Sequence, residues 1–324
     1  MERNVSLDIM KGIAMLAVIA GHTLPIDDPW CRITHTFNLP VFFIVAGYLY
    51  KPSDKYNQKF VSDFKRLIIP YLVIAVAFTV YLLIKESDTV YALKYSVVAS
   101  FFASACNHHS MFLNTAPRIG AAWFLPALFW CRQLFNIVQN KSRYPSFIIV
   151  LLALSATIID YYLINLPLGV LPGMSTMIFY LIGYKAKYIV INKKATISLV
   201  SAGTVCWLLH FRYSYIEMCI CAYGLYPVDI VACTFATWII YHLSIWLSKT
   251  PVESMLSEVG KLSLYIYAFH VIELEVKPYR LLSLPDVWYM EMPIRIAWCI
   301  AAALLYNYIL SPLLYLCFKK TKIS

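Results

Sequence analysis

The polar residues of the first apolar segment have a spacing that could serve chemistry. The stretch "DIMKGIAMLAVIAGH", residues 8–22, places Asp8 and Lys11 near one end and His22 at the other. On a helix, the eleven steps from Lys11 to His22 give an offset of roughly 20° and a rise of ~16 Å, so both side chains follow one face, which Asp8 joins. A histidine there suits proton transfer and a lysine suits an anionic ligand. A snorkelling lysine and a histidine among the lipid headgroups fit the spacing equally well.

Two further pairs of polar residues occur in other apolar segments. In "RITHTFNLPVFF", His35 and Asn38 lie three residues apart, and we expect them one helical turn apart at the outer mouth of the second span. In "LSLYIYAFHVIEL", His270 and Glu273 repeat this spacing. Ionisable groups inside spans are costly and usually line a cavity or pathway. Each pair taken alone is also typical of a satisfied core or headgroup position.

A basic pair and an aromatic run complete the candidate residues. Lys65 and Arg66 in "FKRLIIPYL" stand just before the third apolar run. Such a pair commonly sets orientation, and it also suits the phosphates of a cytoplasmic ligand. Trp123 opens "WFLPALF", a run typical of an interfacial aromatic belt that could also line a site. The sequence has no zinc-type spacing and no HExxH, GxSxG, P-loop or GxGxxG motif, so we predict no metal site.

The composition decides which class of protein positions these residues. Of 324 residues, 61% are hydrophobic and 14% are charged, whereas soluble domains are about half apolar and about a quarter charged. We therefore predict an all-α, polytopic integral membrane protein. The net charge of +10 does not indicate nucleic-acid binding, because the basic residues lie in short loops between apolar runs. The nine cysteines include no CxxC pair and fit small buried residues.

About ten transmembrane helices account for the apolar runs, since a helix needs about 20 residues to cross a bilayer. Ten spans hold provided that two interrupted apolar stretches, 90–106 and 213–226, do not cross. Basic loops at 51–66 and 185–194 and a basic tail then place both termini in the cytoplasm. We predict one membrane domain over residues 1–324, with the first span retained rather than cleaved as a signal peptide. The expected spans are 5–24, 36–50, 67–84, 121–138, 146–164, 171–186, 195–211, 228–247, 262–276 and 291–317.

Six stretches in order resemble the motifs of the membrane acyltransferase-3 family, in particular its fucose-4-O-acetylase-like or polysaccharide O-acetyltransferase branch. The resemblance extends over residues 7–270, nearly the whole chain. It implies a multi-pass protein of the bacterial plasma (inner) membrane. It also implies transfer of an acyl group, usually acetyl, from cytoplasmic acyl-CoA to a hydroxyl of an extracytoplasmic carbohydrate or surface glycan. The stretches are "LDIMKGIAMLAVIAGH", "FNLPVFFIVAGYLY", "KRLIIPYL", "WFLPALF", "FYLIGYKAK" and "LSLYIYAFH".

The first motif of the family assigns roles within the first two spans. The motif is a basic residue, ten residues and a histidine, and it matches Lys11 and His22. The resemblance implies that Lys11, with Asp8, handles the donor and that His22 is catalytic. Lys11 stands where arginine is commoner in the family. Asn38 stands where many relatives have histidine, so His35 is the second candidate catalytic residue.

The later motifs imply the remaining roles. Lys65 and Arg66 match part of an arginine-rich family motif and are expected to bind the donor. The site is expected to be lined by Asn38, Trp123, His270 and Glu273. The implied partners are acyl-CoA, a carbohydrate or glycolipid acceptor and the bilayer. Acetyl-CoA is then a donor substrate, and no bound cofactor is expected.

Two other classes of protein compete with this interpretation. A membrane transporter or channel could use the face with Lys11 and His22 as a proton or anion path. The sequence lacks the paired inverted repeats and matched broken helices that such proteins often show. An inactive sensor or scaffold that kept the fold is the third class, and burying a lysine and a histidine without use is costly. An acyltransferase would consume a thioester, whereas neither a transporter nor an inactive scaffold would.

Overall fold

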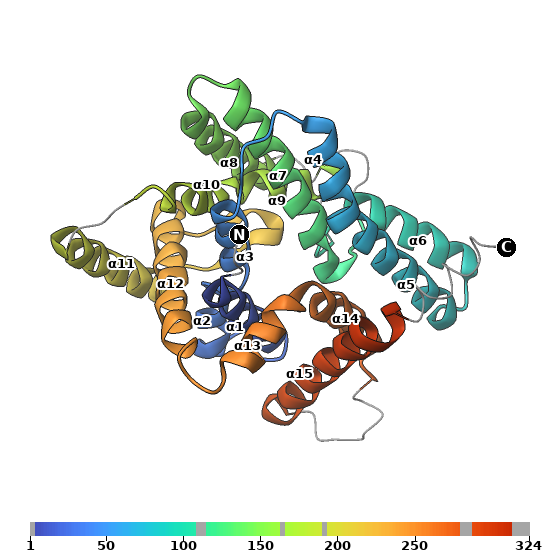
Figure 1. The fold of residues 1–324 in the computed structure, drawn as a ribbon. Helices are drawn as coiled ribbons and strands as arrows, with labels where there is room; N and C mark the ends of the chain where they lie inside the picture. Colours follow the sequence, from blue (N-terminus) through green and yellow to red (C-terminus); the bar gives the residue numbers. More distant parts are fainter. Residues whose placement is uncertain (1–3, 108–114, 163–165, 190–192, 279–286, 313–324) are drawn as a thin grey trace. The chain divides into compact units, whose positions relative to one another are not determined.

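Helices dominate the computed structural model, which confirms the predicted helical class (Figure 1). Among the described residues, the strands are β1 (Ile216–Glu217) and β2 (Ala222–Tyr223), paired antiparallel in one hairpin. The structure describes residues 4–107, 115–162, 166–189, 193–278 and 287–312.

The chain forms two compact units. The terminal unit joins the two ends of the sequence, Met1–Asn38 and Ile239–Ser324, and the central unit is Leu39–Trp238. The boundaries fall after the first residue of α3 (Asn38–Tyr48) and inside α12 (Tyr226–Leu247). The first and the last predicted spans therefore belong to the same unit.

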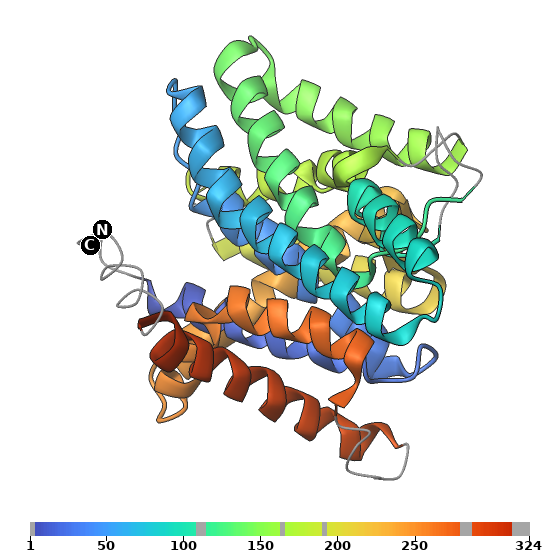
Figure 2. The ribbon, with the colours of Figure 1, turned by 90° about the vertical axis from the view of Figure 1, so that its right-hand side faces the viewer.

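Cap residues fix the first helices of the terminal unit. The side chain of Asn4 accepts a hydrogen bond from the Leu7 N–H at the start of α1, and Asp28 caps α2 in the same way, with Pro29 at the first helical position. The helices of this unit are α1 (Val5–Gly21), α2 (Pro29–His35), α13 (Glu253–Lys261), α14 (Ser263–Val276) and α15 (Trp288–Leu305), which continues as a π-helical turn, Tyr306–Leu310. Helices α14 and α15 lie side by side (Figures 1 and 2).

Helix α1 packs against α13 at a pair of glycines. A Cβ atom on Gly260 would overlap the carbonyl oxygen of Asp8, and one on Gly12 would overlap the carbonyl oxygen of Leu256. Small residues let two helix backbones approach this closely. The crossing holds the turn of α1 that carries Asp8 and Lys11.

The longest helix of the central unit runs over 30 residues, Tyr56–Lys85. It consists of α4 (Tyr56–Asp63), a π-helical turn over Phe64–Ile68 and α5 (Ile69–Lys85). The other helices are α6 (Thr89–Phe102), α7 (Phe124–Lys141), α8 (Pro145–Tyr162), α9 (Val170–Ser175), α10 (Met177–Ala186) and α11 (Lys193–Tyr213), with 3-10 turns at Gly120–Trp123, Pro167–Gly169 and Met218–Ile220.

A second glycine crossing joins α3 to α10. A Cβ atom on Gly47 would overlap the carbonyl oxygen of Tyr180, and one on Gly183 would overlap that of Ile44. The two glycines are reciprocal, because each lies against the backbone of the helix that carries the other. This contact explains the glycines of "FIVAGYLY" and "FYLIGYKAK" without a role in chemistry.

Buried Asp229 closes the connection between α11 and α12. Its Oδ1 lies 2.8 Å from His210 Nδ1, and its Oδ2 accepts hydrogen bonds from Ser214 Oγ at 2.8 Å and from the Leu225 N–H at 2.7 Å. The stretch between these partners is the β1–β2 hairpin and not a helix. The structure thus has no long helix at residues 213–226, which is the condition that the ten-span count requires of this stretch.

Within the described part of the chain, three helices are long and apolar enough to cross a membrane, and a bent pair makes a fourth if it is one span. Helix α6 has 14 residues, which is ~21 Å of helix against about 30 Å of hydrocarbon core. The ten spans and the cytoplasmic termini stay predictions. The end of the last predicted span, from residue 313, lies outside the described residues. The three helices are Tyr56–Lys85, Tyr226–Leu247 and Trp288–Leu310, and the pair, bent by 47°, is Pro167–Ser175 and Met177–Ala186.

Two details of the predicted second and third spans are wrong. Residue 36 does not begin a helix: α2 ends at His35, and α3 starts at Asn38. Between them the Thr36 hydroxyl donates to the Ile33 carbonyl at 2.6 Å and closes a turn. His35 and Asn38 are therefore on different helices and not one helical turn apart on the same helix. The loop predicted at 51–66 is helical from residue 56 onward, because the polar turns of α4 extend the apolar helix that follows them.

Candidate active site

His22 caps the C-terminal end of α1. Its backbone N–H donates to the Val18 carbonyl at 3.2 Å, and the Thr23 hydroxyl donates to the Ile19 carbonyl at 2.8 Å. The last turn of the helix is thus hydrogen-bonded, with His22 at its end.

Helices α2 and α3 supply two more polar groups at this end of α1. The N–H at Nδ1 of His35 donates to the Cys31 carbonyl at 2.7 Å, which leaves Nε2 of the neutral ring with its lone pair. The thiol of Cys31 lies 3.7 Å from the Gly21 carbonyl. A Cβ atom on Gly21 would lie 3.0 Å from His35 Cε1 and 3.5 Å from Asn38 Nδ2. The glycine before His22 therefore lets both side chains approach the helix end.

Helix α14 brings a second imidazole against His22. The ring centroids of His22 and His270 are 5.3 Å apart, with an angle of 44° between the ring planes. His270 is fully buried, and its Nδ1 lies 3.2 Å from Oε2 of Glu273, which is also buried. His270 and Glu273, which are three residues apart in the sequence, thus form a hydrogen-bonded pair on one face of α14.

Helix α15 contributes Arg295, which ties this pair to the end of α1. Its Nε lies 2.9 Å from Oε1 of Glu273, and its Nη2 donates to Oε2 at 3.2 Å. Its Nη1 donates to the carbonyl oxygen of His22 at 2.9 Å and to the Thr23 hydroxyl at 3.0 Å. Arginine suits such a site because its planar guanidinium can bind a carboxylate and other acceptors together.

The other end of α1 carries an ion pair. Lys11 Nζ lies 2.7 Å from Oδ1 of Asp8, and the lysine side chain is 23% exposed. Eleven helical steps lead from Lys11 to His22, a rise of ~16 Å. Helix α1 therefore carries this ion pair in its N-terminal half and His22 at its C-terminal end, and their common face stays a prediction.

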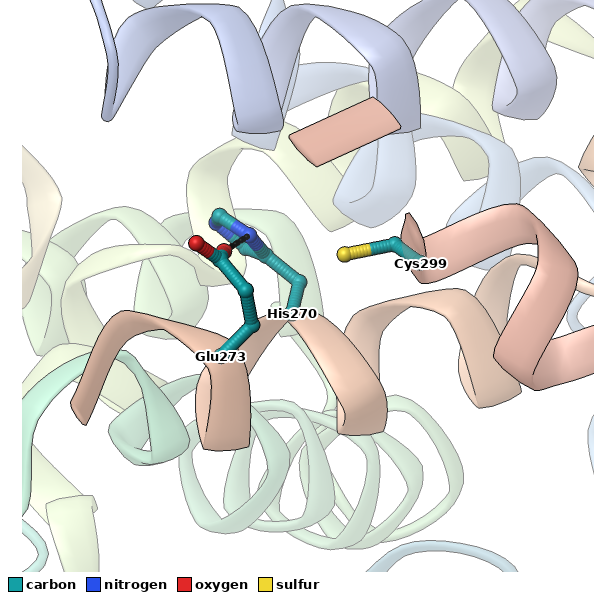
Figure 3. Close-up of side chains that lie close together, drawn as sticks. All are labelled: His270, Glu273 and Cys299. Atoms are coloured by element: carbon teal, nitrogen blue, oxygen red, sulfur yellow. Dashed lines mark hydrogen bonds and ion pairs between the residues drawn. The ribbon is translucent and has the colours of Figure 1, made fainter. Parts of the chain in front are cut away.

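Three side chains of the terminal unit have the chemistry of metal ligands. One ligand atom from each of His270, Glu273 and Cys299 lies within 4.8 Å of the others, and all three residues are buried (Figure 3). Histidine, carboxylate and thiolate form a zinc-type donor set. However, Arg295 already compensates the charge of Glu273 and engages both of its oxygens. A divalent ion would have to lie beside this guanidinium at a buried position, so the donor set does not favour a metal.

Comparison with known protein families matches residues 4–317 to the acyltransferase-3 family, described as an acyltransferase domain. The chain belongs to the acyltransferase-3 family. No curated protein and no solved structure matches it. Because the matched region covers nearly the whole chain, both units are parts of this membrane acyltransferase.

The structure of this acyltransferase brings together most of the site residues predicted in the terminal unit. His22, His35, Asn38, His270 and Glu273 gather at the C-terminal end of α1. The ion pair of α1 lies at the opposite end of the same helix. The roles of these residues in chemistry stay predictions.

The remaining predicted residues belong to the central unit. Lys65 and Arg66 are exposed on the π-helical turn Phe64–Ile68. The turn follows Asp63, whose carboxylate accepts hydrogen bonds from Arg132 and Gln133. π-Helical turns often occur at functional sites. Trp123 of the same unit is buried and packs edge-to-face on the neighbouring phenylalanine with ring centroids 6.2 Å apart. This tryptophan is part of the core of its unit.

Arg295 is the residue of the acyltransferase that sequence reasoning missed. It lies within "PIRIAWCIAAALL", an otherwise apolar run. The rule that selected Lys11, an ionisable residue inside a predicted span, applies equally to this arginine. Its position near the start of the predicted span 291–317 resembles that of a flanking charge, and only the folded contacts distinguish the two cases.

Proposed function

We propose that this membrane acyltransferase transfers an acetyl group from acetyl-CoA to a hydroxyl of a carbohydrate on the outer side of a bacterial plasma membrane. The acyltransferase family supports the reaction class. The observation that carries the rest is the imidazole of His22 at the end of α1, with the polar groups of His35, Asn38 and His270 around it and a lysine along the same helix. Family frequency alone favours acetyl over other acyl groups and a carbohydrate over other acceptors.

His22 is the general base in this proposal. Its neutral ring takes the proton of the acceptor hydroxyl while the oxygen attacks the thioester carbonyl. The carbon–sulfur bond then breaks, and the leaving thiolate receives the proton from the imidazolium, so that ester and free CoA form with all atoms balanced. A covalent acyl-histidine is the alternative route, in which the ring nitrogen attacks the thioester first.

Lys11 holds the donor in this proposal. Its ammonium pairs with Asp8 at 2.7 Å, so the local charge is partly compensated before a ligand binds. A pantetheine arm is comparable in length to the ~16 Å between Lys11 and His22. With the CoA nucleotide on the cytoplasmic side of Lys11, the thioester would reach the imidazole. This arrangement, in which the pantetheine arm lies along α1, requires the predicted orientation with both termini in the cytoplasm.

The proposal is tested with the protein in nanodiscs and acetyl-CoA as the probe. We expect the wild type to bind acetyl-CoA and to release CoA thiol, with methyl glucoside or water as surrogate acceptor. His22→Ala should bind acetyl-CoA normally but lower the turnover by about 10²- to 10⁴-fold, the contribution of a positioned general base. His242→Gln, which changes an exposed histidine of α12, is the matched control.

Three outcomes would contradict the proposal in different ways. Full activity of His22→Ala at normal expression removes His22 from the chemistry. Failure of the folded wild type to bind acetyl-CoA or longer acyl-CoAs removes the donor. Movement of a solute across the membrane without thioester consumption would identify a transporter instead. Protein labelled by radioactive acetyl-CoA in the absence of an acceptor, and unlabelled in His22→Ala, would identify the acyl-histidine route.

A further inference from the structure

The buried polar groups of α14 and α15 form one connected network. His270, Glu273 and Arg295 are 0%, 1% and 3% exposed. Oε2 of Glu273 accepts a hydrogen bond from Arg295 Nη2 at 3.2 Å and lies 3.2 Å from Nδ1 of His270, while Oε1 forms an ion pair with Arg295 Nε at 2.9 Å. An ionised carboxylate can only accept hydrogen bonds, so Nδ1 of His270 carries the hydrogen. The neutral ring then has its lone pair on Nε2.

That Nε2 atom of His270 is a buried acceptor without a hydrogen bond among the described residues. Buried polar atoms are nearly always paired, so an unpaired one needs an explanation. The adjacent ring is His22, with centroids 5.3 Å apart. A small rotation of either ring, or one bridging water, would let a His22 N–H donate to this Nε2.

Arg295 contacts the backbone of His22. Its guanidinium holds the carbonyl oxygen of His22 at 2.9 Å and the hydroxyl of Thr23 at 3.0 Å, while it pairs with Glu273. The backbone of His22 and the carboxylate that orients His270 are therefore fixed by one side chain. The network contacts His22 at both its carbonyl group and its ring.

We propose that Glu273, His270 and Arg295 are positioning residues for His22, an inference that rests on the proposed function. Glu273 sets the tautomer of His270, and Nε2 of His270 accepts the hydrogen bond of one His22 ring nitrogen. The other ring nitrogen of His22 then faces the acceptor hydroxyl with its lone pair. When His22 takes the hydroxyl proton, His270 and the carboxylate stabilise the imidazolium until the proton passes to the CoA thiolate. His270 is fully buried and so acts through His22 and not on the substrate.

The first test compares kinetics with binding for acetyl-CoA. We expect Glu273→Gln and Arg295→Lys to lower kcat by roughly 10- to 100-fold, the usual effect of removing a group that orients a functional histidine. The Kd of acetyl-CoA should stay within about twofold, because neither residue is at the donor end of α1. Glu275→Gln, two residues along α14, is the matched control and should keep wild-type kcat.

A double-mutant cycle separates positioning from a structural role. In a His22→Ala background, Glu273→Gln should cause no further loss of kcat, because its effect passes through the imidazole that is gone. Equal losses in both backgrounds would show that Glu273 supports the fold and would overturn the proposal. Wild-type kcat in both Glu273→Gln and Arg295→Lys would overturn it as well, and would leave the proposed function intact.

A spectroscopic arm needs no acceptor and no turnover. Protein labelled with ¹⁵N-histidine should show His270 protonated at Nδ1 and not at Nε2, with the seven histidines assigned by substitution. Glu273→Gln should change the ring signals of both His270 and His22. The opposite tautomer, or a His22 signal that Glu273→Gln and Arg295→Lys leave unchanged, would contradict the network. If the wild type does not bind acetyl-CoA at all, the proposed function fails, and these signals still decide whether the network exists.

Discussion

The carbonyl oxygen of Asp8 lies where a Cβ atom on Gly260 would have to be. The same residue of α1 pairs its carboxylate with Lys11 at 2.7 Å. The contact between α1 and α13 and the ion pair of the expected donor end therefore share one helical turn. A change in helix packing there should reach both stability and donor binding.

Gly260→Ala is expected to destabilise the protein. The added methyl group would meet backbone and not a flexible side chain, so the helices must separate, and overpacking of this kind costs about 1–3 kcal/mol. The change should appear as a lower midpoint of thermal unfolding in nanodiscs. Ser254→Ala, at an exposed position of α13, is the control. An unchanged midpoint in Gly260→Ala would show that the crossing is looser than the structure has it.

Lys11→Ala is expected to weaken the binding of acetyl-CoA without removing the chemistry. The lost ammonium should raise the Kd by about tenfold or more, which corresponds to about 1.4 kcal/mol or more, and kcat at saturating donor should change little. Isothermal titration with acetyl-CoA measures the first quantity and thiol release the second. Lys261→Ala removes an exposed lysine of the same unit and should bind normally. Equal Kd values for Lys11→Ala and the wild type would remove Lys11 from the donor site.

The double change Lys65→Ala/Arg66→Ala is expected to weaken donor binding in a salt-dependent way. Both residues are exposed, so their attraction to CoA phosphates should be screened as the ionic strength rises. Compared with the wild type, the Kd should rise most at low salt and converge at high salt. Lys85→Ala/Lys94→Ala makes the same change of net charge elsewhere on α5 and α6. A similar rise of the Kd in this control would show that donor binding depends on the overall charge and not on Lys65 and Arg66.

Cys299→Ala is expected to leave thiol release unchanged, and so is treatment of the wild type with a chelator. Arg295 already compensates the carboxylate beside this thiol, so the activity should not need an ion there. Elemental analysis of the purified protein provides a second measurement. Stoichiometric zinc that disappears in Cys299→Ala would show that the three side chains bind a metal after all.

Several helices could be placed from the sequence because polar residues or prolines delimit their apolar runs. Helix α1 was expected from residue 5, and Asn4 caps it there. Helix α8 begins at Pro145 and α12 ends at Leu247, within a residue of the expected limits. The i, i+3 pair His270 and Glu273 could also be found by spacing, since spacing on a regular helix determines a face.

The missed features depend on contacts that no local pattern contains. The turn between His35 and Asn38 interrupts a run that hydropathy treats as continuous. The polar turns of α4 carry few apolar residues and do not register as part of a span. Arg295 resembles a charge at the end of a helix until the carbonyl of His22 and the carboxylate of Glu273 are seen beside it.

The continuous helix Tyr56–Lys85 has a mechanical consequence for the basic pair that it carries. Its 30 residues extend over ~45 Å, whereas the hydrocarbon core is about 30 Å thick. Residues 67–85 are enough to fill that core, so α4 would extend beyond it as a rigid continuation of the same rod. Lys65 and Arg66 then have no loop to adjust their height above the lipid. The thickness of the bilayer would set how far this charge stands from the membrane surface, and lipid chain length would tune donor capture without any lipid-binding site.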